Sequence, residues 1–107
     1  MTLTRDVKLT VKERINRDPE FAVGLLNEAI SLFINGEPDT ARLMLRDLVN
    51  ATVGFEELAT KINKPSKSLH RMLSERGNPT MENLTAIFNA LRQELSVELT
   101  VQAVACA

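Results

Sequence analysis

Two residues near the middle of the chain constrain its fold more than any others. Asn63 and Pro65 stand between two short amphipathic segments. Asparagine is the non-glycine residue that best tolerates a positive φ, so Asn63 can reverse the chain after a helix over 55–62. Proline is accepted only in the first turn of a helix, so the next helix must begin at 64–66. The sequence therefore predicts two short helices, about 55–62 and 65–75, that cross at a steep angle.

The side chains that such a helix pair requires are present between residues 54 and 79. Ala59 is small and stands midway along the first helix, where the second helix must approach closely. Basic and hydroxyl side chains fill the second helix. Two crossed helices, the second of which carries basic and hydroxyl side chains, are the pattern of a helix-turn-helix that binds DNA. The apolar residues expected to join the two helices are Leu58, Ile62, Leu69 and Met72.

Positive charge is concentrated in the same region. The formal net charge of the 107 residues is −1. Residues 61–76, the basic patch, nevertheless hold five basic side chains and one acidic one, a local charge of +4 that leaves −5 for the rest of the chain. Attraction to phosphate depends on a local patch rather than on the total charge. The distribution of charge therefore strengthens the prediction of a nucleic-acid-binding helix.

These segments resemble the Xre/lambda-repressor-like family of helix-turn-helix proteins. Within that family the chain is most similar to addiction-module antidotes, the antitoxin half of a toxin–antitoxin pair. The resemblance implies a small toxin as partner and an operator upstream of the protein's own operon. It extends over roughly residues 18–99 and rests on EELATKIN (56–63), SKSLHRML (66–73), GNPTMENLTAIFNAL (77–91) and, for the narrower match, DPEFAVGLLNEAI (18–30) and residues 45–59.

The resemblance also implies which side chains contact double-stranded DNA. In this family the start of the second helix and the position one turn along face the bases, and these positions correspond here to Ser66, Lys67 and Arg71. Lys67 and Arg71 stand four residues apart and so share a helix face. Arg71 can donate two hydrogen bonds to O6 and N7 of guanine. The candidates for phosphate contact, which set the register without reading sequence, are Lys61, Lys64, Ser68 and Arg76.

Two ring side chains beside this face are expected to be structural. His70, the only histidine, flanks the reading face and is expected to be a partly solvated surface residue. Phe55 stands where many repressors of the family place a polar side chain that touches DNA. We expect Phe55 to pack instead at the start of the first helix, which removes one base contact that the family pattern would imply.

Further helices are predicted from the residues that begin and end them. Residues 4–17 carry apolar side chains at every fourth position. Asp-Pro-Glu at 18–20 begins a helix that Asn35-Gly36 ends, and Glu-Pro-Asp at 37–39 begins another. Thr80 caps a last helix that has an apolar stripe along one side. The expected fold class is therefore all-α, with five or six helices.

The C-terminal tail has a different period. From Ser96 to Gln102 apolar and polar residues alternate strictly, which predicts one half-buried β-strand. The sequence offers no second strand, and a lone strand leaves its backbone groups unpaired. We therefore expect the strand, through Val97, Leu99 and Val101, to meet another chain. That chain is either a second copy across a two-fold axis or the edge of a toxin.

The expected organisation has three parts. They are an N-terminal helical extension (1–36), a helix-turn-helix DNA-binding domain (37–94) and a C-terminal strand and tail (95–107). The extension could pack on the domain, build the dimer or hold the toxin. The single cysteine, Cys106, excludes an intrachain disulfide, and the N-terminus has no long apolar run. We therefore expect a cytoplasmic protein without a signal peptide or membrane span.

The sequence argues against an enzyme. One histidine and one cysteine cannot build the usual zinc sites within one chain, and neither a phosphate-binding loop nor a nucleophile elbow is present. No cofactor or metal is expected. The predicted function is that of a dimeric, sequence-specific transcriptional repressor, the antitoxin of its own operon. Two alternatives stay open: a repressor without a toxin, and a protein-interaction module that kept the helix-turn-helix scaffold but no longer binds DNA.

Overall fold

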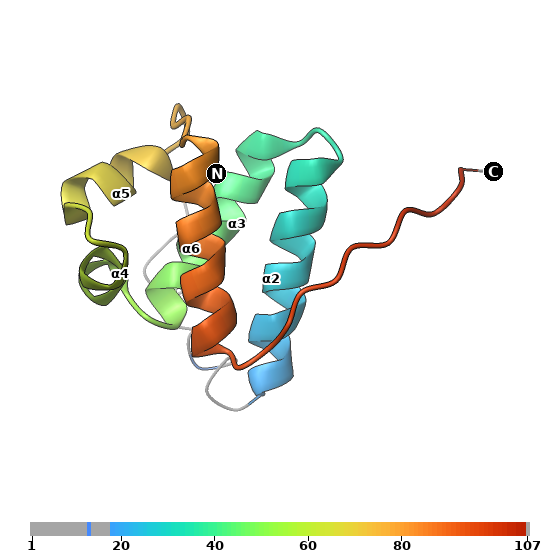
Figure 1. Ribbon diagram of the computed structural model, residues 1–107, viewed down its shortest axis with the longest axis horizontal. Helices are drawn as coiled ribbons and strands as arrows, with labels where there is room; N and C mark the ends of the chain where they lie inside the picture. The colour runs from blue at the N-terminus through green and yellow to red at the C-terminus, as the bar shows by residue number, and fades with distance from the viewer. Residues whose placement is uncertain (1–12, 14–17, 107) are drawn as a thin grey trace.

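The protein is an all-α structure in which the helices surround one hydrophobic core (Figure 1). The computed structural model describes residue 13 and residues 18–106. Within this part of the chain there are five helices and no strand, which confirms the predicted helical class. The helix expected over 4–17 lies outside the described residues, apart from residue 13. The five helices are α2 (Pro19–Ile34), α3 (Pro38–Ala51), α4 (Phe55–Ile62), α5 (Ser66–Met72) and α6 (Met81–Glu94).

The longer helices begin and end at the capping residues that the sequence predicts. The Asp18 carboxylate accepts a hydrogen bond from the Glu20 amide at 3.2 Å, and a proline occupies the first turn of α2. Gly36 follows α2 with φ 87°, the left-handed conformation that glycine adopts without strain. Thr80 caps α6, because its Oγ1 accepts a hydrogen bond from the Asn83 amide at 3.1 Å. These bonds satisfy amides that a helix's first turn leaves without partners.

The helix at 19–34 shares its core with the rest of the molecule. α2 lies alongside α3, and α6 crosses between this pair and the two short helices (Figure 1). The rings of Phe33 and Phe88 meet edge to face with centroids 5.6 Å apart, so α2 is also joined to α6. The boundary expected at residue 36 is therefore a turn within one core. The fully buried side chains include Ala22 and Leu26 of α2, Leu45 and Leu48 of α3, and Ile87 and Leu91 of α6.

The tail after α6 is extended and forms no strand within the single chain. Val97 and Leu99 are partly buried against the core, whereas Val101 is 73% exposed. The tail then leaves the body of the molecule, as the red end of the ribbon shows (Figure 1). A strand is defined by a ladder with a neighbour, and no described segment offers one to residues 96–102. No helix in the described part of the chain is long and apolar enough to cross a bilayer.

The loop between α5 and α6 closes tightly against the end of α5. Its Gly77 is buried, and the Gly77 amide donates to the Ser74 carbonyl oxygen at 3.0 Å. A Cβ added at Gly77 would lie 2.1 Å from the Met72 carbonyl oxygen and 2.5 Å from that of Arg71. Both contacts are with backbone, which cannot rotate away. Only glycine therefore fits at this position without moving the loop.

We predict opposite effects for two glycine-to-alanine substitutions. Gly77→Ala should lower the free energy of unfolding by about 2–3 kcal/mol, because the loop must move away from α5. Gly24→Ala is the matched control: this residue lies within α2, and an added Cβ would meet nothing within 4 Å. It should raise the free energy of unfolding by about 0.5–1 kcal/mol. Urea denaturation of the two variants measures both, and equal effects would contradict the close approach at Gly77.

Candidate nucleic-acid interface

A three-residue turn joins α4 to α5 at the residues that the sequence predicts. Asn63 has φ 57° and ψ 48°, in the left-handed region, and the Lys64 amide donates to the Ala59 carbonyl oxygen at 3.0 Å. This bond closes α4 as a left-handed cap does in general. Pro65 follows, and α5 begins at Ser66. The predicted reversal and the predicted start of the second helix are both confirmed.

The second helix ends earlier than predicted. It stops at Met72 rather than near 75. The Ser74 hydroxyl donates to the Arg71 carbonyl oxygen at 2.7 Å, and the chain then turns toward Gly77. The tight loop at Gly77 requires the chain to leave the helix at this point. α5 is thus seven residues long, and residues 73–76 belong to the loop.

The predicted apolar contacts between the two short helices are present. Leu58 and Leu69 are fully buried and Ala59 is 8% exposed, so the small side chain does lie in the packed interior. Ile62 and Met72 are partly buried against the same core. Leu73, just beyond α5, is also fully buried. One side of α5 is therefore fixed to the core by apolar packing.

The other side of α5 presents basic side chains to solvent. Lys67 and Arg71 are exposed and stand one helical turn apart. Lys64 before the helix and Arg76 after it are exposed as well. Among the described residues, no carboxylate lies within salt-bridge distance of these four side chains. Ser66 and Ser68, the two hydroxyl candidates, are half-buried on the same helix.

Lys61 differs from the other basic candidates because its charge is compensated. Its Nζ lies 3.2 Å from a carboxylate oxygen of Glu94 and 3.8 Å from one of Glu57. The first contact joins the end of α4 to the end of α6, across 33 positions of sequence. Sequence reasoning placed Lys61 with the phosphate contacts and did not find its partner in α6. Lys61 is thus the member of the basic patch that an ion-pair cluster holds.

Phe55 and His70 form a stacked pair that joins the first turn of α4 to α5. Their ring centroids are 4.0 Å apart and the ring planes differ by 14°. Phe55 is 5% exposed, as expected for a residue that packs at the start of the helix. His70 is exposed and covers it. The predictions for both residues are confirmed, and the stack adds a second attachment of α5 to α4.

Arg42 is a supporting residue that sequence reasoning missed. It is the one buried charged side chain in the described part of the chain, 7% exposed, and it extends from α3 to the loop after α5. Its Nε donates to the Ser74 carbonyl oxygen at 3.2 Å and its Nη2 to that of Glu75 at 3.1 Å. The Nη2 also meets the Asp39 carboxylate. A signal was available, because Arg42 is in helical phase with the apolar Leu45 and Val49.

We predict that Arg42→Met lowers the free energy of unfolding by about 2 kcal/mol, because the carbonyl oxygens of Ser74 and Glu75 lose their donor. Asp39→Asn is the control. It removes the other charge of the same ion pair, but the Asp39 side chain is 82% exposed, so the change should stay within about 1 kcal/mol. Thermal or urea unfolding of both variants measures the difference. Similar losses in the two would mean that the ion pair, rather than the carbonyl contacts, is the important interaction.

Comparison with known proteins gives no match among family models, curated proteins or solved structures. The described residues contain no group of three or more His, Cys, Asp or Glu side chains that could hold a metal ion. The chemistry open to the helix pair is therefore that of its exposed basic and hydroxyl groups. These groups donate hydrogen bonds and carry positive charge, which suits an anionic partner.

Proposed function

We propose that this protein is a sequence-specific DNA-binding regulator of the helix-turn-helix class, in which α5 enters the major groove. The observation that carries the proposal is the pair of exposed, unpaired basic side chains on α5, Lys67 and Arg71, on a helix whose opposite side is anchored by Leu69. A helix of seven residues is about 10 Å long. With its side chains an α-helix is about 10–12 Å across, which fits a major groove about 12 Å wide.

The candidate residues divide into two roles. Arg71 donates its two parallel N–H groups to the O6 and N7 of a guanine, and Lys67 makes a similar but less directional contact one turn earlier. Ser66, in the first turn of α5, meets a base edge or a phosphate. Lys64 and Arg76 stand at the two ends of the helix, where the phosphate backbones flank the groove. Ser68 adds a hydroxyl donor to the same set.

As a regulator the protein would act as a dimer on a near-palindromic operator. Two copies of α5 would then occupy successive major grooves about 34 Å apart. By the resemblance to addiction-module antidotes, the operator lies upstream of the protein's own operon and the partner is a small toxin. Regulation would occur in the cytoplasm by occlusion of the promoter.

One observation favours a second candidate, a protein-interaction module that does not bind DNA. Glu57 and Glu94 neutralise Lys61 at the edge of the basic patch, and the whole chain carries a net charge of −1. Both features weaken attraction to phosphate. Against this, the four unpaired basic groups around α5 have no structural role within the described part of the chain.

The experiment that tests the proposal is binding of the purified full chain to the DNA upstream of its own gene, compared with random duplex, across a salt series. We expect preference for the upstream DNA and an affinity that falls steeply with salt, because phosphate contacts release counterions. Equal weak binding to both duplexes, or none, would favour the protein-interaction module. Capture of the neighbouring gene product would then be the relevant measurement.

We predict that Arg71→Ala weakens binding to the specific site by about 1–3 kcal/mol and relaxes one base position. Arg71→Lys is the matched variant, because it keeps the charge and loses the planar fork. Arg71→Lys should keep most of the affinity for random DNA and the same salt dependence of that affinity. It should lose discrimination between bases at the specific site. If both variants lose equal affinity on specific and random DNA, Arg71 is a phosphate contact instead.

We also predict that Glu94→Gln strengthens DNA binding at low salt by roughly two- to fivefold, because it leaves Lys61 with Glu57 alone and removes a negative charge beside Lys61. Glu28→Gln removes the same charge from α2, on the side of the molecule away from α4 and α5 (Figure 1). This control should change affinity less. Fluorescence anisotropy with labelled duplex measures both variants, and an equal response to the two would show that only net charge matters.

A further inference from the structure

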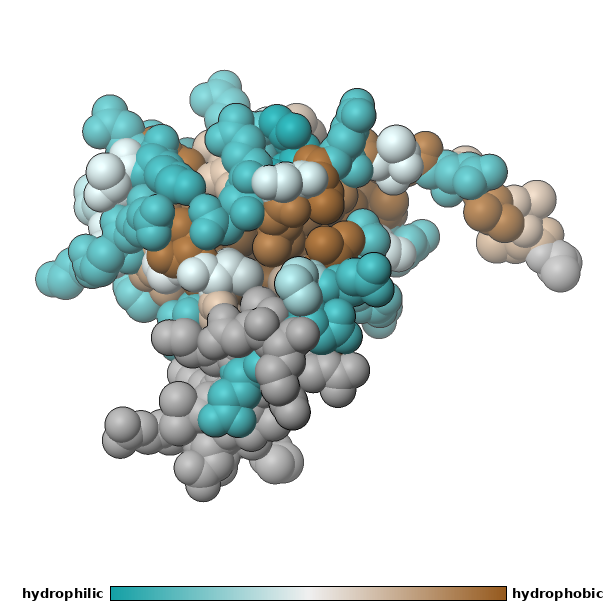
Figure 2. All heavy atoms as spheres, turned by 90° about the horizontal axis from the view of Figure 1, so that it is seen from below, coloured by the Kyte–Doolittle hydropathy of each residue, from teal (hydrophilic) through white to brown (hydrophobic). Residues whose placement is uncertain are grey.

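The C-terminal tail is an extended segment whose backbone makes no backbone hydrogen bond beyond Val97 among the described residues. The amide of Val97 donates to the Arg92 carbonyl oxygen at 3.1 Å, and no backbone–backbone hydrogen bond follows it among the described residues. Within the described part of the chain, the backbone donors and acceptors of residues 98–106 therefore have no backbone partner. The tail also projects from the body, next to a face on which hydrophobic side chains gather (Figure 2). Such a segment is suited to pair with another strand.

The side chains of the tail fall into two rows, according to whether the residue number is odd or even. Because successive residues of an extended chain point to opposite sides, the odd-numbered and even-numbered residues form two rows. Val97 and Leu99 of the odd row pack against the core, but Val101 in the same row is 73% exposed. The apolar row thus begins in the core and continues uncovered. The odd row is Val97, Leu99, Val101, Ala103 and Ala105, and the even row is Glu98, Thr100, Gln102, Val104 and Cys106.

We infer that the tail pairs antiparallel with the tail of a second copy, and that the two-fold axis passes through Val101. In an antiparallel pair, side chains directly opposite each other lie on the same face. An axis that passes through a residue sets odd positions against odd positions, so the two apolar rows meet. An axis between residues would instead set the odd row against the even row, which is polar apart from Val104 and Cys106. The parity of the sequence therefore selects the first arrangement.

The position of the axis follows from the extent of the row and from charge. With the axis at Val101, Val97 lies opposite Ala105 and Leu99 opposite Ala103, so the whole apolar row of each copy is used. Glu98, the only charged side chain of residues 97–106, then lies opposite Val104 of the other copy. The two carboxylates are kept apart, and no like charges oppose each other across the ribbon.

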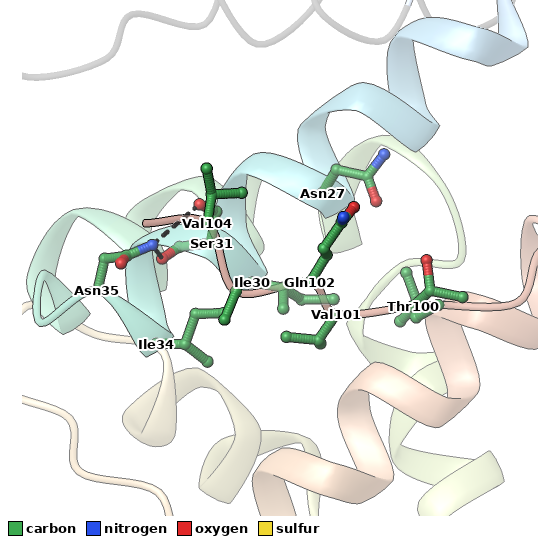
Figure 3. Close-up of a pocket in the computed structure, with 11 residues that line it drawn as sticks. Asn27, Ile30, Ser31, Ile34, Asn35, Thr100, Val101, Gln102 and Val104 are labelled. Atoms are coloured by element: carbon green, nitrogen blue, oxygen red, sulfur yellow. Dashed lines mark hydrogen bonds between the residues drawn. The ribbon is translucent and has the colours of Figure 1, made fainter. Parts of the chain in front are cut away.

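The surface beside the tail suits a two-stranded ribbon. Ile30 and Ile34 of α2 line an open groove together with Val101 and Val104 of the tail (Figure 3). Ile34 is 62% exposed and Val104 is 80% exposed. An isolated two-stranded ribbon is marginal in water. Here each strand is attached to its own core through Val97 and Leu99, and apolar side chains of α2 lie next to it.

Sedimentation velocity of the full chain without DNA tests the interface, independently of whether the protein binds DNA. We expect a dimer for the native sequence. Val101→Lys should raise the dimer dissociation constant about tenfold or more, since two ammonium groups would face each other at the axis. Gln102→Lys adds the same charge to the polar row one residue away and should have a much smaller effect. A monomeric native protein, or a dimer insensitive to Val101→Lys, would overturn the inference.

A mixing experiment tests the position of the axis. Val101→Lys and Val101→Glu should each be largely monomeric alone, and a mixture of the two should form a heterodimer, because position 101 faces position 101. The side chain is exposed in the single chain, so thermal unfolding should confirm that both variants stay folded. Failure of the mixture to associate would overturn an axis at Val101. Association restored by the pair would support it, since a toxin-binding tail would show no such pattern.

Discussion

The left-handed residue Asn63 is the constraint on which the arrangement of the two short helices depends. Its φ of 57° ends α4 and directs the chain back within three residues. Leu69 can then reach the core while Lys67 and Arg71 face solvent. Without this turn the helical pattern of α4 would continue, and the basic residues would lie along a longer helix with no support behind them. Any residue other than glycine, asparagine or aspartate at position 63 would destabilise the turn by about 1–2 kcal/mol.

α5 depends on its neighbours for its helical form. A helix of seven residues is too short to be stable alone in water, because the cost of nucleation is not recovered over so few hydrogen bonds. Leu69 fixes its middle, the Phe55–His70 stack joins it to α4, and Arg42 binds the loop that follows it. The guanidinium of Arg42 also places positive charge near the end of α5 where the carbonyl oxygens gather. The burial of this charge is tolerated because hydrogen bonds and a carboxylate compensate it.

Features encoded by neighbouring residues could be predicted from the sequence, and those made by distant ones could not. The capping bonds of Asp18 and Thr80 span two or three residues, so the starts of α2 and α6 were evident. The carbonyl contacts of Arg42 and the ion pair of Lys61 with Glu94 join residues more than 30 positions apart. No periodicity in the sequence predicts such contacts. The strand predicted at 96–102 is not formed within the described part of the chain.

The shortness of α5 has a consequence for how the fold opens. The helix buries a single side chain, Leu69, whereas α3 buries five apolar side chains and α6 buries three. Local unfolding of α5 therefore exposes little apolar surface and leaves the core of α2, α3 and α6 intact. Segments of this kind lie at the low end of a protein's range of hydrogen-exchange protection. Any partner that binds the ordered helix lowers the population of the open state by mass action. The partner therefore sets the stability of the segment that it binds.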